Sequence, residues 1–150
     1  MLICSEDHPL AIAKKLTLKQ IVQHPLVLAS EESGSRIQLE RVFMKAGIHE
    51  NMQVTMTAST LPLILSYVSM GFGISLITAS SAFKLPASKR GQPRLVVRHV
   101  QDLFGHEQVV ILQRKGRYEL PHVKAFRELV EEEFRSQNTT IANLPDHGTT

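Results

Sequence analysis

Two short stretches of the sequence gather hydroxyl side chains directly after short apolar runs. Residues 30–35 hold three serines, and residues 57–60 hold two threonines and a serine. Each stretch precedes a segment with a helical pattern, and the free N–H groups and dipole of a helix N-terminus favour an anion. We therefore predict a site for a small polar or anionic ligand. The candidate ligand-binding hydroxyls are Ser30, Ser33, Ser35, Thr57, Ser59 and Thr60.

The same residues have a simpler interpretation as helix caps, because Ser and Thr are preferred at the N-cap position. One residue per helix is enough for a cap, however, and each stretch offers three hydroxyl side chains. The pattern supports a ligand site and capping alone equally, and both interpretations stay open at this point.

Arg36 is also a candidate ligand-binding residue, and it lies just inside the first of these predicted helices. The positive end of a helix dipole disfavours a cation there, so we expect a negatively charged partner. A carboxylate or sulfate of a ligand would serve. Glu31 or Glu32 would serve as well, and we slightly favour this structural alternative.

Motifs for catalysis or metal binding are not found in the sequence. The seven histidines are scattered, and none has the i, i+4 spacing of a metal-binding helix. The sequence also lacks a nucleophile elbow, a phosphate-binding glycine loop and a dinucleotide fingerprint. We therefore expect no enzyme activity, no metal and no cofactor.

The composition is that of an ordinary globular protein. A chain of 150 residues makes one domain or two small lobes. Seventeen basic against fourteen acidic residues give a net charge of only +3, which favours a mixed surface over a nucleic-acid patch. With one cysteine, no signal-peptide pattern and no apolar run of membrane-spanning length, we expect a cytoplasmic location and no membrane contact.

The elements expected to position these residues alternate between strands and helices. Apolar runs predict strands at residues 1–4, 26–29, 52–56 and 74–78, and helical patterns lie at 16–22, up to about 46, and up to 70. This order predicts an α/β fold with a parallel sheet and helices on both faces. Ligands of such sheets bind at the C-terminal ends of the strands, where the hydroxyl stretches lie.

The second part of the sequence is less regular. We expect a surface connection from about 80 to 93, a strand at 95–97, a loop at 101–107 and a strand at 108–112. Pro121 is suited to the first turn of a helix. The buried stripe of that helix is predicted to be Val123, Phe126, Val130 and Phe134, and the chain is expected to become a frayed tail from 136.

Five motifs, taken in order, resemble the effector-binding domain of LysR-type transcriptional regulators. They are Asp-His-Pro-Leu-Ala at 7–11, His-Pro-Leu-Val at 24–27, Ser-Gly-Ser-Arg at 33–36, the helix at 39–47, and Val-Ser-Met-Gly-Phe-Gly-Ile at 68–74. The resemblance covers residues 2–135. Leu-Phe-Gly-His at 103–106 and Thr-Ala-Ser at 57–59 are most similar to the branch that controls cysteine biosynthesis and sulfur assimilation.

The resemblance implies a fold like that of type 2 periplasmic binding proteins, with the effector in a cleft between two lobes. Residues 5–96 would form the whole of lobe two. Residues 1–4 and 97–135 would form hinge strands and part of lobe one, and 136–150 a flexible tail. The implied effector is a small anion such as sulfate or acetylserine, contacted by Ser30, Thr57 and Ser59. Members of the family are homo-oligomers that regulate transcription.

Three features of the family pattern lie outside this sequence: the helix-turn-helix, the linker helix and the first half of lobe one. DNA would therefore be bound only through a helix-turn-helix that this chain does not contain. Apolar side chains of lobe one would be exposed, so we expect association with another copy or with the missing segment. The alternative class that shares the fold is a solute-binding protein of a transporter.

Overall fold

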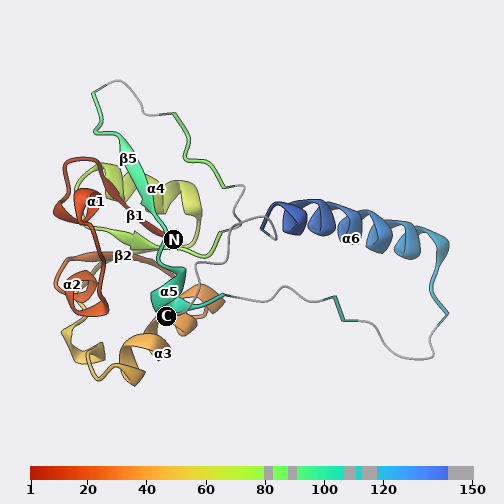
Figure 1. Ribbon diagram of the computed structural model, residues 1–150, viewed down its shortest axis with the longest axis horizontal. Coiled ribbons are helices and arrows are strands. Elements are labelled where there is room, and N and C mark those ends of the chain that lie inside the picture. Colours follow the sequence, from red (N-terminus) through yellow and green to blue (C-terminus); the bar gives the residue numbers. More distant parts are fainter. Residues whose placement is uncertain (80–82, 88–90, 107–110, 113–117, 142–150) are drawn as a thin grey trace, which may run out of the picture. The chain divides into compact units, whose positions relative to one another are not determined.

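The computed structural model describes residues 1–79, 83–87, 91–106, 111–112 and 118–141 (Figure 1). The chain divides into two compact units, Met1–Gln108 and Val109–Thr150, and each is described here by itself.

A three-stranded and a two-stranded sheet, joined by one bridge, organise the first unit. Its strands are β1 (Leu2–Ser5), β2 (Leu26–Ala29), β3 (Val54–Ala58), β4 (Ser75–Leu76) and β5 (Leu95–Arg98). β2 and β3 pair in parallel, and a parallel bridge between Leu26 and Ile74 links them to the start of β4. β1 lies between β4 and β5 and is antiparallel to both.

The direction of β1 corrects the prediction of an all-parallel sheet. That prediction is right for β2, β3 and β4 and wrong for β1. The rule for βαβ units applies to a single crossover helix between two strands. Between β1 and β2 the chain forms two short helices, α1 (Pro9–Ile12) and α2 (Leu18–Val22), and reverses its direction.

The longer helices follow the predicted pattern closely. They are α3 (Gly34–Lys45) and α4 (Leu61–Ser69), and a 3₁₀ turn, η1 (His49–Asn51), follows α3. Thr17 caps α2 in a capping box with Gln20, as its type and position suggested. Residues 101–107 were predicted to be a loop, but α5 (Gln101–Phe104) is a short helix.

Successive side chains of a strand point to opposite faces, and the core is accordingly divided into two clusters. Leu2, Cys4 and Leu28 face one cluster, which includes Phe43 of α3. Ile3 and Val27 face the other, where α4 packs. Cys4, the one cysteine of the chain, is buried in the first cluster as a packing residue.

Glycines end α4 and start the next strand. Gly71 follows the C-cap residue Met70 with φ of 82°, a left-handed conformation that glycine adopts without strain. Gly73 has φ of 147°, and a Cβ atom there would collide with the carbonyl oxygen of Pro25. The two glycines therefore form a helix stop followed by a tight turn.

The second unit contains α6 (Pro121–Ile141). It begins at Pro121 as predicted and continues past residue 136, where a frayed tail was expected. The predicted strand at 108–112 lies mostly outside the described residues, including Val109, and its described residues Ile111 and Leu112 are not in a strand. No helix among the described residues is both long and apolar enough to cross a membrane.

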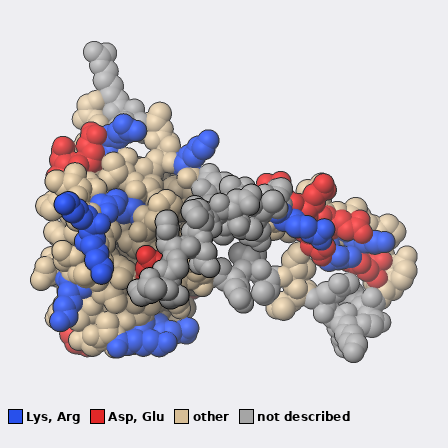
Figure 2. Space-filling model, viewed as in Figure 1, with Lys and Arg blue, Asp and Glu red and all other residues tan. Residues whose placement is uncertain are grey.

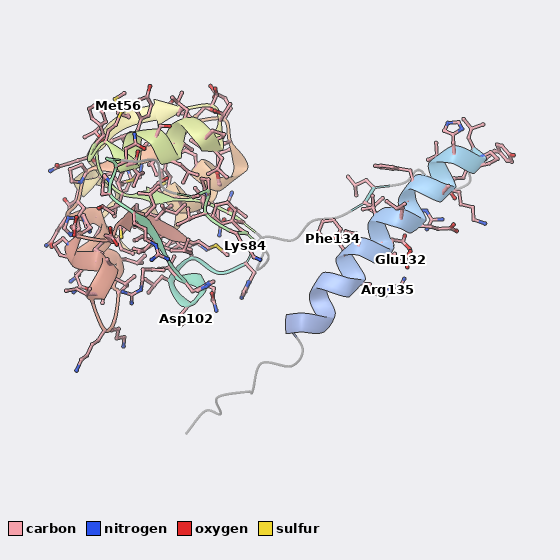
Figure 3. The ribbon with its side chains drawn as sticks, turned by 90° about the horizontal axis from the view of Figure 1, so that it is seen from above. Met56, Lys84, Asp102, Glu132, Phe134 and Arg135 are labelled. Carbon is pink, nitrogen blue, oxygen red and sulfur yellow. The ribbon has the colours of Figure 1, made fainter. Side chains whose placement is uncertain are left out.

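The stripe of α6 that was predicted to be buried is instead mostly exposed, and only Val130 is half-buried. Val123, Phe126 and Phe134 all retain 44–69% of their accessible surface. Phe134 and Glu132 lie on opposite sides of the helix (Figure 3). The apolar face of α6 is therefore largely uncovered within its unit.

Candidate functional site

The first hydroxyl stretch forms the start of α3. Ser33 is the N-cap, and its Oγ accepts a hydrogen bond from the backbone N–H of Arg36 at 3.2 Å. The Ser35 Oγ lies 3.3 Å from the Ser33 Oγ. Ser30, directly after β2, is half-buried, and its hydroxyl has no hydrogen-bond partner within the described part of the chain. Capping therefore accounts for Ser33 but not for Ser30.

The strand that precedes the second stretch ends two residues later than predicted. β3 ends at Ala58 rather than at Met56, so Thr57 is a strand residue and not part of the loop that follows. Thr60 is at the N-cap position of α4, but its side chain makes no capping hydrogen bond. Thr57, Ser59 and Thr60 are all exposed. Capping does not account for this stretch.

Strand register brings the two stretches together. Leu28 pairs with Thr57 and Ala29 pairs with Ala58 in the parallel ladder of β2 and β3. Ser30 and Ser59 each come next in the chain, so they leave the same edge of the sheet from adjacent strands. Because neighbouring strands lie about 4.8 Å apart, hydroxyls from both stretches can reach one small ligand.

Arg36 finds its negative partner within its own helix. Its Nε donates to Oε1 of Glu40 at 2.5 Å, one turn along α3. The prediction of Glu31 or Glu32 as the structural partner was therefore wrong, and both of those side chains are exposed. The i, i+4 spacing of Arg36 and Glu40 was the sequence signal for this ion pair.

The environment of Arg36 is unusual for a charged group. Its side chain is only 7% exposed and shares the buried face of α3 with Leu39 and Phe43. Its Nη1 atom is buried without a hydrogen-bond partner among the described residues. An unpaired donor of this kind costs free energy unless a ligand or water accepts its hydrogen bond.

Sequence reasoning missed a second arginine with a structural role. Arg98 of β5 donates from Nη1 to the carbonyl oxygens of Leu10 and Ala11 at 2.9 and 2.7 Å, and from Nη2 to Ala13 at 2.7 Å. These carbonyls lie at the C-terminal end of α1, where a cation is favourable. The contact spans more than 80 residues of sequence, so no local pattern indicated it.

Charges and possible metal ligands are spread over the molecule. On the face of the first unit seen in Figure 2, Lys and Arg side chains are scattered rather than gathered into one patch. Among the described residues, no group of three or more His, Cys, Asp or Glu side chains is arranged to hold a metal ion.

The fold and the site define a class: an α/β lobe of the periplasmic-binding-protein type, with hydroxyl groups at the C-terminal ends of two parallel strands. The family model described as the LysR substrate binding domain matches residues 1–135. The chain belongs to this family.

Relatives of this chain are transcriptional regulators. The chain is 30% identical over 132 residues to a RuBisCO operon transcriptional regulator of Allochromatium vinosum, covering 87% of this chain and 41% of the relative. It is 28% identical over 124 residues to the regulator CysB of Burkholderia cenocepacia, covering 83% and 37%. The chain therefore spans about two-fifths of the length of these relatives.

Solved structures share the fold. The cofactor-binding domain of the Cbl transcriptional regulator aligns with a TM-score of 0.65 at 23% identity, over 90% of this chain and 59% of that domain. The CcmR regulatory domain of Synechocystis PCC6803, in complex with 2-PG, aligns with a TM-score of 0.66 at 15% identity, over 87% and 60%. The family match and the sequence similarity to transcriptional regulators, rather than the shared fold, favour the regulator over the transporter alternative.

Proposed function

We propose that this chain is the effector-sensing part of a LysR-type transcriptional regulator and that a small anion binds where β2 and β3 end. The observation that carries the proposal is the start of α4. Thr60 occupies the N-cap position there without capping the helix. The first-turn N–H groups of Leu61 and Leu63 therefore remain available to an external acceptor, since Pro62 has no N–H and intrahelical bonds begin later.

The hydroxyl groups beside this helix start would complete the site. Ser30 and Ser59 would donate from adjacent strand ends, and Thr57 and Thr60 from the exposed side of the same stretch. The start of α3, with Ser33 and Ser35, would supply the positive end of a second helix dipole. Arg36 would add charge only if its unpaired Nη1 reaches the ligand, because Nε is held by Glu40.

The effector is proposed to be sulfate or an acetylserine. One relative supports a small-molecule effector: the CcmR regulatory domain is solved in complex with 2-PG. The donors assembled at the two helix starts are all uncharged groups except Arg36, which suits a small anion held by hydrogen bonds.

Signalling would proceed by a population shift. A ligand that contacts both lobes stabilises the closed arrangement by its differential affinity for that state. Residues 5–96 would form lobe two, and residues 1–4 and 97–135 the hinge strands and part of lobe one. β1 and β5 pair along their whole length, as suits a hinge. The tail would be 136–150.

The whole regulator is proposed to be a cytoplasmic homo-oligomer without catalytic activity. It would bind DNA through a helix-turn-helix outside this sequence. The exposed apolar face of α6 supports self-association, because covering each large apolar side chain contributes about 1.5–3 kcal/mol.

Calorimetry of the chain with sulfate, thiosulfate, O-acetylserine and N-acetylserine tests the site. We expect one of these anions to bind, and Ser59→Ala and Thr60→Ala to weaken its binding by about tenfold to a hundredfold each, as for a lost hydrogen bond to a charged group. Ser66→Ala is the matched control, because its hydroxyl donates to the Pro62 carbonyl within α4. Absence of binding for all four anions would contradict the sulfur assignment.

A further inference from the structure

A groove lies along α4 and begins at Leu61, directly after the hydroxyl stretch that ends at Thr60. Its volume is about 970 Å³, and its described walls are α4, residues 83–87 and residues 92–97. We call it the α4–β5 groove. None of the seven predicted ligand-binding residues lines it. Because its walls come from segments far apart in sequence, only the fold reveals it.

The floor of the α4–β5 groove is apolar. Five half-buried side chains form it and pack on the second core cluster: Leu61, Phe83, Leu85, Leu95 and Val97. Each keeps part of its surface open to the groove. A contiguous apolar surface of this kind, bordered by polar groups, marks a place where a ligand or partner binds.

The rim of the groove is cationic. Lys84 and Arg94 line it, both are exposed, and neither forms an ion pair with any described residue. Figure 3 shows Lys84 at the surface of the unit. No acidic side chain is among the described lining residues. In the sequence, residues 79–94 carry four basic residues and no acidic one.

The two serine hydroxyls of the groove are already engaged. The Ser66 Oγ donates to the Pro62 carbonyl at 3.0 Å, and the Ser69 Oγ donates to the Ser66 carbonyl at 2.8 Å. The nearby Glu6 carboxylate accepts a hydrogen bond from the backbone N–H of Arg94 at 3.2 Å. The two side-chain cations are therefore the groups that a ligand would meet.

We infer that the α4–β5 groove binds an amphipathic anion: a carboxylate, or a comparable acid, carried on an apolar body. The apolar floor takes the body, and Lys84 and Arg94 take the charge. Ligand pockets for organic molecules measure about 300–1,000 Å³, and this groove lies at the upper end of that range. Sulfate or acetylserine would leave its floor in water, so the groove is a second site for a different ligand class.

Calorimetry of the full chain with octanoate tests the inference. Octanoate is expected to bind saturably and more tightly than 1-octanol or octylammonium. Affinity is expected to rise about two- to fourfold per methylene from hexanoate to octanoate, as burial of each CH₂ predicts. The double variant Lys84→Gln, Arg94→Gln is expected to bind about three- to thirtyfold more weakly, as for two partly exposed charge pairs.

Two controls separate the groove from other surfaces. Lys14→Gln with Lys45→Gln removes two exposed charges outside the groove and should leave octanoate affinity unchanged. Val123→Ser with Phe126→Ser removes apolar surface on α6 and should also leave it unchanged.

Three results would overturn the inference: no saturable octanoate binding, equal affinity for octanol, or wild-type affinity in the double variant. A dimer that forms through the groove, insensitive to octanoate and lost in the double variant, would overturn it as well. Sulfate titration of the double variant keeps the two sites distinct, because the proposed effector site should be unaffected.

Discussion

α3 and α4 both begin with hydroxyl residues after a parallel strand, yet their two starts are built differently. Ser33 satisfies the start of α3 with a side-chain cap, whereas Thr60 leaves the start of α4 uncapped. Their ends differ too. Gly47 lies in open space after α3, whereas Gly73 is pressed against Pro25 after α4. α3 combines a capped start with an unobstructed exit, and α4 combines an uncapped start with a tightly packed exit.

The largest effect is expected at the packed exit. Gly73→Ala would place a Cβ against the Pro25 carbonyl oxygen at a φ that L-residues avoid, and should destabilise the fold by about 3 kcal/mol or more. Gly47→Ala, at φ of 67° with no atom nearby, should cost only about 1 kcal/mol. Urea denaturation of both variants compares the two helix ends, and equal losses would contradict the packing argument.

The next effect concerns the charge held within α3. Glu40→Gln removes the negative partner of the buried Arg36 guanidinium and should destabilise the fold by about 2 kcal/mol, less than for a fully buried pair because Glu40 is partly exposed. Glu31→Gln is the control, and its exposed side chain predicts a change within about 0.5 kcal/mol. Thermal unfolding measures both. If the Glu31 variant were the more damaging one, the assignment of Glu40 as partner would fail.

A third prediction is that a substitution at the start of α3 affects stability, whereas one at the start of α4 affects anion binding. Ser33→Ala removes a cap and should lower the free energy of unfolding by about 1 kcal/mol. Thr60→Ala removes no cap and should change stability by less than about 0.5 kcal/mol while weakening anion binding. Chemical denaturation and calorimetry on the same two proteins test this. A stability loss in the Thr60 variant equal to that of the Ser33 variant would contradict the open helix start.

The smallest effect extends the comparison to α1, whose cap is titratable. The His8 Nδ1 accepts from the backbone N–H of Leu10 at 3.2 Å, and its ring contacts His24 at a centroid distance of 4.5 Å. Burial, and then the neighbouring His24, lower the pKa of His8 below its ordinary value of 6.5. The unfolded chain therefore binds a proton more readily than the folded one.

The stability contributed by neutral His8 should thus be fully present above pH 6.5 and decline as the pH falls from there toward the folded-state pKa. His8→Asn keeps an N-cap acceptor that does not titrate, so its unfolding free energy should depend less on pH in this window. Denaturation at several pH values tests this, and an unchanged pH dependence in the variant would assign the effect to another group.

Local patterns predicted the parts of the fold that local physics determines. β2 follows from its apolar run, and the start of α6 follows from the fixed conformation of Pro121. α1 and α5 were missed, because four-residue helices carry too short a period to detect. The direction of β1 and the contacts of Arg98 depend on segments far apart in the chain.

The candidate site was predicted in composition and only partly in geometry. The hydroxyl stretches lie at one sheet edge as expected, but β3 is shifted by two residues and includes Thr57. Whether a hydroxyl caps its helix depends on a side-chain rotamer, so the sequence could not distinguish Ser33 from Thr60. The α4–β5 groove requires three segments to meet and left no local signal.

The most direct test of the proposed site is an amide NMR titration of the chain with sulfate. The predicted result is saturable shifts of the N–H signals of Leu61 and Leu63, at the uncapped start of α4, together with Ser59. The N–H of Arg36, already bonded to the Ser33 hydroxyl, should shift less. Shifts confined to the start of α3, or none at either helix, would contradict an anion site at the ends of β2 and β3.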